Sequence, residues 1–295
     1  MDEKKSSHVP VMLEEVCSFM QLATGKTYID ATLGLGGHAE ALLERSAPAG
    51  KLFGIDRDEN ALALARERLD RFGDRAQFAH GNFDEVANIA RDHGFDKVDG
   101  ILADLGVSSM QLDKSERGFS FMREGPLDMR MDESRGESAA DFIAHIGETE
   151  LADVIYQFGE ERFSRRIAKN IVVERKKRRI ETTGELAEIV ARSVPGRRGR
   201  IHPATRTFQA LRIAVNDELG QLERFLEQAI GLLGKGGRLV VISYHSLEDR
   251  PVKNTFRSTA KDLGTVLTKK VVTPSREEQM SNPRARSAKL RVFER

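Results

Sequence analysis

Short strand-like runs alternate with helix-like segments through the first hundred residues of the chain. The strand-like runs occupy residues 27–31, 51–55, 76–80 and 98–103. The segments between them show the three- and four-residue apolar spacing of helices. This alternation predicts right-handed βαβ units, whose parallel sheet is covered by helices on both faces. Because such sheets bind ligands at the carboxyl ends of their strands, polar residues that follow each run are candidate site residues.

The alternation stops for about a hundred residues in the middle of the chain. From residue 111 to about 208 the apolar spacing is helical only, and loops containing glycine and proline interrupt it. A strongly helical pattern over 215–233 then leads into a buried strand over 238–243. Two further runs, 265–272 and 288–293, are expected to be closing strands.

These patterns predict an α/β fold with one insertion. We expect a Rossmann-like, doubly wound and mostly parallel sheet formed by residues 1–110 and 209–295, interrupted by an inserted helical domain, 111–208. The insertion is the candidate substrate-recognition domain because residues 162–200 contain thirteen Lys or Arg and only four Asp or Glu. Such a basic surface suits a nucleic-acid backbone, although a solvated helical face would give the same pattern.

Composition excludes the secreted and membrane classes. Cys17 is the only cysteine among 295 residues, which rules out a disulfide framework or a thiolate metal site. No apolar run approaches the roughly 18 residues that span a bilayer, and the first residues do not resemble a signal peptide. We therefore expect a cytoplasmic protein without a membrane partner. We also expect no metal, since no residues are spaced as metal ligands.

A glycine-rich turn follows the first strand-like run. Asp30 lies near the end of that run, four residues before Gly34, and Gly34, Gly36 and Gly37 lead to a helix start at His38. Glycines allow positive φ and close approach of a ligand, and a helix start offers free N–H groups. This strand–turn–helix unit is a candidate binding site for a nucleotide-containing cofactor.

Polar residues after the next three runs extend the predicted cofactor site. Asp56 closes the second run, where a carboxylate can accept hydrogen bonds from both ribose hydroxyls. Asn82 and Phe83 follow the third run and are placed to bracket an adenine with an amide and an apolar side chain. Asp104 closes the fourth run. Together these residues predict one adenosine-binding site.

Two cofactors fit this outline, NAD and S-adenosylmethionine. The string Gly34-x-Gly36-x-x-Ala39 also satisfies the dinucleotide pattern. S-adenosylmethionine is favoured because Asp30 lies where methyltransferases place an acidic group near the methionine end, and because no second mononucleotide-binding half follows. Thr32 departs from the usual loop, since it stands where a first glycine is expected. We therefore predict an S-adenosylmethionine-dependent methyltransferase sheet, with an NAD-dependent oxidoreductase as the alternative.

Residues after the fourth and fifth strands indicate which atom is methylated. Methylation at C5 of a pyrimidine normally needs a cysteine thiolate, but Cys17 lies on an apolar helix face and is expected in the core. An exocyclic amine instead needs acceptors for its N–H groups, and a flipped base needs a stacking surface. The candidate catalytic residues are Asp104, Ser108, Ser109, Tyr244 and His245. Two alternatives stay open: Asp104 contacts the cofactor alone, and His245 is a structural histidine.

Longer strings along nearly the whole chain resemble the RsmH (MraW) family. They include Asp104–Ser109, Arg117–Phe121, Gly125–Met131, Gly159–Phe163, His202–Arg212, His245–Arg250 and Asn282–Ser287. Members of this family are bacterial S-adenosylmethionine-dependent methyltransferases that modify N4 of a cytosine in the decoding region of 16S ribosomal RNA. The resemblance implies the same activity here, on 16S RNA in the small ribosomal subunit or its late precursor. A homodimer is left open.

The resemblance also implies individual site residues. It places cofactor contacts at Gly36, Gly37, His38, Asp56, Phe83, Asp104 and Gln111. Four arginines inside family strings are candidate RNA contacts, namely Arg117, Arg130, Arg162 and Arg206. For each arginine, an intramolecular pair with a carboxylate is the alternative. An RNA-binding module with a vestigial methyltransferase site is the remaining alternative function.

Overall fold

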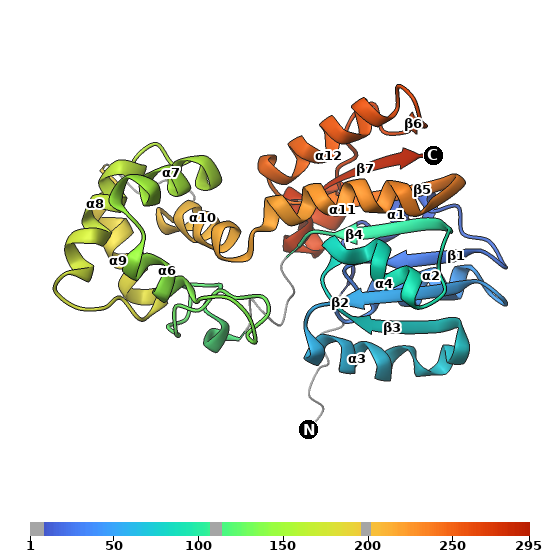
Figure 1. Cartoon of the computed structure of the whole chain (residues 1–295), viewed down its shortest axis with the longest axis horizontal. Helices are drawn as coiled ribbons and strands as arrows, with labels where there is room; N and C mark the ends of the chain where they lie inside the picture. The colour runs from blue at the N-terminus through green and yellow to red at the C-terminus, as the bar shows by residue number, and fades with distance from the viewer. Residues whose placement is uncertain (1–8, 107–113, 196–201) are drawn as a thin grey trace. The chain divides into compact units, whose positions relative to one another are not determined.

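The computed structural model describes residues 9–106, 114–195 and 202–295. Contacts divide the chain into two compact units, one formed by Met1–Gly106 with Gly220–Arg295 and the other by Val107–Leu219. The described strands all belong to the first unit (Figure 1).

A seven-stranded sheet in the order β3-β2-β1-β4-β5-β7-β6 forms the centre of the first unit. Its strands are β1 (Thr27–Asp30), β2 (Lys51–Asp56), β3 (Ala76–His80), β4 (Val98–Asp104), β5 (Leu233–Ser243), β6 (Thr265–Val266) and β7 (Lys289–Glu294). Strands β1 to β5 pair in parallel, and β7 pairs antiparallel with both β5 and β6. The doubly wound, mostly parallel sheet predicted from the alternating pattern is confirmed.

Helices cover both faces of this sheet, because successive strand residues point to opposite faces. Ile29 of β1 belongs to a core cluster with residues of α4, α11 and α12, whereas the preceding Tyr28 belongs to a cluster with residues of α1, α2 and α3. The helices of this unit are α1 (Leu13–Phe19), α2 (Gly37–Arg45), α3 (Glu59–Leu69), α4 (Val86–Asp92), α11 (Glu218–Leu232), α12 (Ser246–Thr259) and α13 (Arg276–Ser281), with short 3₁₀ turns η1 (Asp70–Arg75), η2 (Phe83–Glu85) and η4 (Pro283–Ser287).

The first closing strand is shorter than predicted. Regular pairing with β7 ends at Val266 and returns only as an isolated bridge between Val272 and Leu290. Between these points the Oγ1 of Thr268 accepts a 2.9 Å hydrogen bond from the backbone N–H of Val292. The prediction of a strand over 265–272 was therefore wrong beyond Val266, because a side chain takes the place of the backbone partner.

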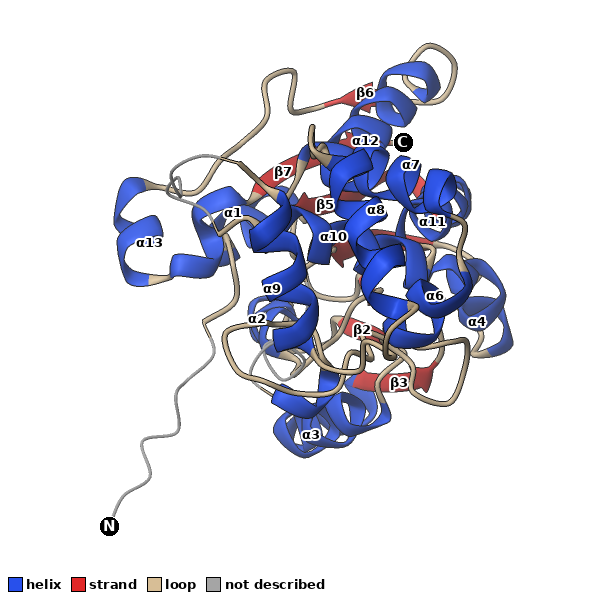
Figure 2. Ribbon diagram, turned by 90° about the vertical axis from the view of Figure 1, so that its left-hand side faces the viewer, coloured by secondary structure: helices blue, strands red, loops and turns tan. Residues whose placement is uncertain are grey.

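The second unit consists of helices and long loops in its described residues. Its elements are η3 (Ser115–Arg117), α6 (Ala139–His145), α7 (Glu148–Gly159), α8 (Ser164–Arg175), α9 (Thr183–Ser193) and α10 (Ala204–Asn216). Figure 2 shows the helices in blue and the loop that leads into α6 in tan. One hydrophobic cluster joins α6 to α10 through residues such as Ile143, Ile155, Ile171, Val190 and Leu211. This unit thus has a core of its own.

The return to the sheet lies farther along the chain than residue 208. Helix α10 packs against α7 and α9 and so belongs to the second unit. Asp217 has a left-handed backbone, with φ of 47°, and separates α10 from α11. The single helix predicted over 215–233 is therefore two segments, because Val215 and Asn216 end one helix before Glu218 begins the next.

Candidate cofactor and catalytic site

The turn after β1 has the backbone geometry expected of a ligand cradle. Gly34 and Gly36 have φ of 52° and 75°, in the left-handed region that favours glycine. A Cβ added at Gly34 would meet no atom nearer than 3.9 Å, so this side of the turn is open. The turn lies beside the point where the strand order reverses, between β1 and β4, which is where doubly wound sheets bind their ligands.

Asp56 at the end of β2 holds this turn against the sheet. Its Oδ2 accepts a 2.7 Å hydrogen bond from the N–H of Gly34, and its Oδ1 accepts one of 2.9 Å from the N–H of Asp58. Burial raises the pKa of the Asp56 carboxyl, and these two backbone donors partly oppose that effect. Each oxygen keeps a second lone pair, so the predicted ribose contact and the observed backbone contacts are compatible.

Asp104 at the end of β4 is oriented by three neighbours. Its Oδ1 accepts hydrogen bonds from the Tyr244 hydroxyl, at 2.8 Å, and from the N–H of Gly106, at 3.2 Å. Its own N–H donates to the Oγ1 of Thr32, at 2.7 Å. Among the described residues, Oδ2 of Asp104 has no hydrogen-bond partner. The carboxylate therefore has one oxygen fixed within the protein and one left for a ligand.

Tyr244 joins the ends of β4 and β5, and this explains how two candidate catalytic residues meet. Its ring lies against Gly106, where an added Cβ would come within 2.8 Å of the ring. Burial raises the pKa of the Tyr244 hydroxyl well above its usual value, and the adjacent Asp104 carboxylate raises it further. The hydroxyl is therefore protonated at neutral pH and acts as a hydrogen-bond donor.

Asp30 contributes a buried carboxyl beneath the turn. Only 1% of the residue is exposed, its Oδ1 accepts a 3.2 Å hydrogen bond from the N–H of Thr32, and Oδ2 has no partner among the described residues. Burial raises the pKa of this carboxyl to about 7, and the nearby Asp104 and Asp56 carboxylates add to the increase. The carboxyl therefore keeps its proton to a higher pH than an ordinary aspartate.

The predicted adenine-binding pair lies at the end of β3. Phe83 begins η2, is half-buried, and packs its ring 5.2 Å from that of Phe225 in α11. The Oδ1 of Asn82 is buried and has no hydrogen-bond partner among the described residues. The end of β3 therefore offers an anchored aromatic ring beside an amide with unused hydrogen-bonding capacity.

The two histidines on the list of candidates make structural contacts. The Nε2 of His38, a buried residue, lies 2.9 Å from the carbonyl oxygen of Val11 and ties the start of α2 to the segment before α1. His245 caps α12: its Nδ1 accepts a 3.3 Å hydrogen bond from the N–H of Glu248, and its Nε2 lies 3.0 Å from Oε1 of the same residue. These contacts are those of the structural alternative for His245, and its catalytic role stays a prediction.

Two residues that the sequence analysis did not assign also shape the site. Thr32, which replaces a glycine of the usual loop, provides the hydroxyl that accepts the N–H of Asp104. Buried Glu248 accepts hydrogen bonds through Oε2 from the N–H groups of Tyr244, at 2.7 Å, and His245, at 3.2 Å. Glu248 stands three residues after His245, which is the spacing of a capping box at the start of α12, but because that motif normally begins with Ser or Thr the string was not a clear signal in the sequence.

Three predicted site residues, Ser108, Ser109 and Gln111, lie outside the described residues. Their assigned roles stay predictions.

Of the four candidate RNA-binding arginines, two make strong contacts inside the second unit. Arg117 is buried and donates to the carbonyl oxygens of Arg130 and Met131. Arg130 forms a bidentate pair with Asp128, through Nε at 2.9 Å and Nη2 at 2.8 Å. Such pairs match the intramolecular alternative for these two residues.

The other two candidate arginines are exposed. The Arg206 guanidinium donates to the carbonyl oxygen of Glu160, at 3.1 Å. The Arg162 guanidinium lies 4.7 Å from the centre of the Phe163 ring. Both therefore present charge to solvent, and their role in RNA binding stays a prediction.

Taken together, the first unit has the arrangement typical of α/β proteins that bind a nucleotide-containing cofactor. It has a glycine turn at the switch point, carboxyl groups after β1, β2 and β4, and an aromatic ring after β3. No helix among the described residues is both long and apolar enough to cross a membrane.

Comparison with known proteins specifies the family. The model of the MraW methylase family matches residues 5–295, and the chain belongs to this family. A relative from Dehalococcoides mccartyi, named ribosomal RNA small subunit methyltransferase H, is 52% identical and covers 98% of this chain and 86% of its own. A relative of the same name from Sorangium cellulosum is also 52% identical, with 98% of this chain and 90% of its own covered. The resemblance drawn from the sequence strings is thereby confirmed.

Proposed function

We propose that this chain transfers a methyl group from S-adenosylmethionine to N4 of a cytosine in the decoding region of 16S ribosomal RNA. The substrate would be the small ribosomal subunit or its late precursor, in the cytoplasm. The family match over 5–295 carries the proposal, and relatives at about half identity bear the name of a small-subunit ribosomal RNA methyltransferase. The amine as acceptor is supported by the Asp104 carboxylate and by the core position of Cys17.

The residues at the strand ends suit S-adenosylmethionine. The turn is open at Gly34, so a ligand can approach its backbone closely. Asp56 has lone pairs free for ribose hydroxyls, and Phe83 offers an apolar contact for adenine. Among the described residues no group pairs with the Oδ1 of Asn82, which leaves hydrogen-bonding capacity for a ligand. When bound, this cofactor supplies a methyl group on a positively charged sulfur.

The role of Asp104 would be to hold the amine in position. An exocyclic amine shares its lone pair with the ring, so its N–H groups must be held before that lone pair can point at a methyl group. The free Oδ2 of Asp104 would accept one N–H, while Tyr244 and Gly106 keep the carboxylate from turning. Fixing the reacting groups in this way can supply much of the rate of a transfer reaction.

The second unit would bind RNA through exposed cations of α8. Arg165, Arg166 and Lys169 are exposed, and none of them has an ion pair among the described residues. By contrast, Arg175 donates to the carbonyl oxygens of Ile143 and Ile146. The unpaired group is therefore the better candidate for phosphate contacts.

Deletion of the gene for this chain tests the proposed function. Digestion of 16S RNA from the deletion strain, followed by mass spectrometry of nucleosides, should show loss of an N4-methylated cytidine of the decoding region. The chain supplied on a plasmid should restore it. Calorimetry adds a direct check: binding of NAD with no binding of S-adenosylhomocysteine would decide for an oxidoreductase instead.

A further inference from the structure

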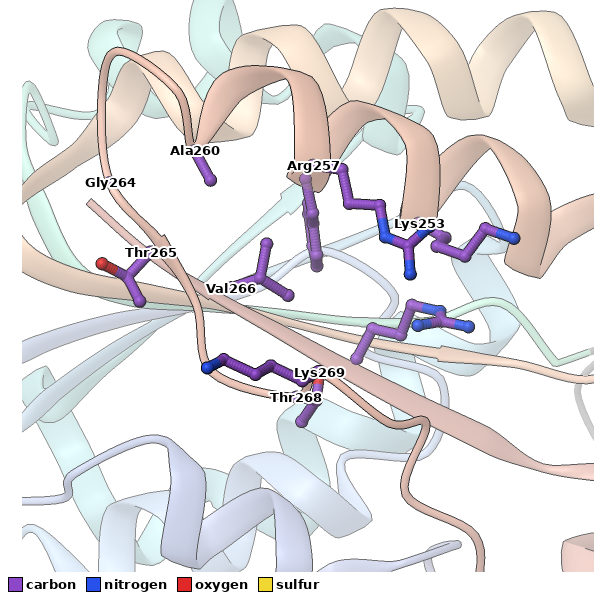
Figure 3. A pocket seen from close by; sticks show the side chains of 10 residues that line it. Lys253, Arg257, Ala260, Gly264, Thr265, Val266, Thr268 and Lys269 are labelled. Carbon is purple, nitrogen blue, oxygen red and sulfur yellow. The ribbon is translucent and has the colours of Figure 1, made fainter.

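A pocket away from the candidate cofactor site lies between α12 and the strand-and-loop segment that begins at β6 (Figure 3). Its volume is about 540 Å³, within the range of small-molecule sites. Thr265 pairs with Glu294, which in turn pairs with Arg238 in the middle of β5, whereas Arg291 pairs with Val241 near the carboxyl end of that strand. The pocket therefore runs along β7, and strand β5 separates β7 from the β4 strand that ends at Asp104.

Of the described residues, four basic side chains and no acidic one line the pocket. Lys253 and Arg257 come from α12, Lys269 from the segment after β6, and Arg291 from β7. Arg291 is neutralised by a bidentate pair with Asp249, at 2.6 and 2.9 Å. Among the described residues the other three cations have no ion pair or hydrogen bond, so the pocket carries an uncompensated positive charge.

The arrangement of these groups matches a phosphate with an attached organic group. Lys253 and Arg257 are four residues apart and so share one face of α12, where both can donate to the same anion. Lys269 comes from the facing segment, and its amino group points away from Lys253 and Arg257 (Figure 3). Ala260 and Val266 provide a half-buried apolar wall that suits a sugar or a base.

We propose that this pocket binds a nucleotide of the RNA substrate, with its phosphate on Lys253 and Arg257 and its sugar or base against Val266. The inference rests on the proposed function, since it gives the RNA a second contact at a distance from the methyl-accepting base. A nucleotide within RNA is favoured over a free nucleotide because Arg257 and Lys269 are exposed. Because these cations lie on an open rim, the RNA strand has room to continue on either side of the bound nucleotide.

The double variant Lys253→Gln/Arg257→Gln tests this site. Its affinity for a 16S RNA fragment containing the decoding region should fall roughly tenfold, and the slope of log affinity against log salt should shrink by about two. A matched control is Lys51→Gln/Lys235→Gln, which removes two exposed lysines near the amino ends of β2 and β5. The control should bind RNA as the wild type does, and unchanged thermal melting of both variants verifies the fold.

Free cytidine monophosphate separates the two sources of nucleotide. Unchanged RNA affinity in the double variant overturns the proposal. If RNA affinity is unchanged in the double variant while cytidine monophosphate binds the wild type and not the variant, the pocket serves a free nucleotide instead. Wild-type protein that neither binds nor methylates the RNA would refute the proposed function as well, so the two failures differ in the wild-type measurement. The same RNA affinity, measured with the single variant Lys269→Gln, tests the lysine on the facing side of the pocket.

Discussion

The hydroxyl of Tyr244 donates a 2.8 Å hydrogen bond to Oδ1 of Asp104, although 140 positions separate the two residues in the chain. Pairing of β4 with β5 brings them together, since Asp104 is in register with Ile242, two residues before Tyr244. The contact fixes one oxygen of the carboxylate and leaves the other for a ligand. The contact therefore sets the orientation of Oδ2, the oxygen proposed to accept a hydrogen bond from the amine.

Tyr244→Phe should lower the kcat of methyl transfer roughly 2- to 12-fold, because one hydrogen bond of about 0.5–1.5 kcal/mol is lost. The loss should be partial, since the ring and its contact with Gly106 are kept. Steady-state kinetics with labelled S-adenosylmethionine measures the effect. Tyr156→Phe, in an exposed tyrosine of α7, is the control. A Tyr244→Phe enzyme as fast as the wild type would show that the hydroxyl does not position Asp104.

Asp56→Ala should weaken binding of S-adenosylhomocysteine by about 1.5–3 kcal/mol, the scale of a hydrogen bond to a charged group. Isothermal titration calorimetry provides the measurement. Asp99→Ala is a matched control. The Oδ2 of Asp99 also accepts a backbone hydrogen bond, but from Thr27 at the amino end of β1, away from the glycine turn that follows this strand. Equal affinities of wild type and Asp56→Ala would mean that the ribose contact is assigned to the wrong residue.

Asp30 should make the free energy of unfolding fall between about pH 4 and pH 7. The pKa of an ordinary aspartate, as in the unfolded chain, is 3.8, whereas that of Asp30 in the folded protein is about 7. Between these two values the unfolded chain releases the proton and the folded protein keeps it, so a rise in pH favours unfolding. The cost is at most about 4 kcal/mol and is constant above the folded pKa.

Asp30→Asn keeps the acceptor for the Thr32 N–H and cannot ionise. The difference in unfolding free energy between pH 4.5 and pH 8, measured by urea denaturation, should therefore be smaller in the variant than in the wild type. The same pH dependence in both proteins would contradict a protonated Asp30.

Cys17→Ala should leave methyl transfer within about twofold of wild type. The thiol is buried in α1, and burial raises its pKa to about 11, so it holds no reactive thiolate at neutral pH. A thiol reagent should label the native protein far more slowly than the urea-unfolded chain. Loss of activity in a folded Cys17→Ala enzyme would instead point to a cysteine-dependent C5 mechanism.

Removing the exposed cations of α8 should reduce the salt dependence of RNA binding. The variant Arg165→Gln/Arg166→Gln/Lys169→Gln should lower the slope of log affinity against log salt by about two to three. Arg178→Gln/Arg179→Gln is the comparison, because these arginines pair with Glu185 and Asp141. Equal slopes for the wild type and the triple variant would show that this face of α8 does not touch phosphate.

The sheet could be predicted from the sequence because its signals are local. Each of the strands β1 to β4 is a short apolar run that ends at a turn or a polar residue, as at Gly34 after β1 and at Asp56. The end of β6 could not be predicted, because it depends on the Thr268 hydroxyl replacing a backbone partner of Val292. The break between α10 and α11 depends on the left-handed conformation of Asp217, which helical periodicity does not encode.

The candidate site was predictable as a list of positions but not as a set of contacts. The strand ends located Asp56 and Asp104, yet only the fold shows that Asp56 anchors Gly34 and that Thr32 anchors Asp104. Likewise, only the fold shows that His245 caps α12. The type and position of a residue show which hydrogen bonds and charges it can offer a ligand. They do not show which of these are already taken up by residues far away in the chain.

Methylation of isolated small subunits tests the central claim most directly. Small ribosomal subunits from the deletion strain would be incubated with this protein and methyl-labelled S-adenosylmethionine, and the digested RNA examined by mass spectrometry. We predict that the label appears as N4-methylcytidine at one cytosine of the decoding region. Label in 5-methylcytidine, label outside 16S RNA, or no transfer from folded protein that binds the cofactor would contradict the account.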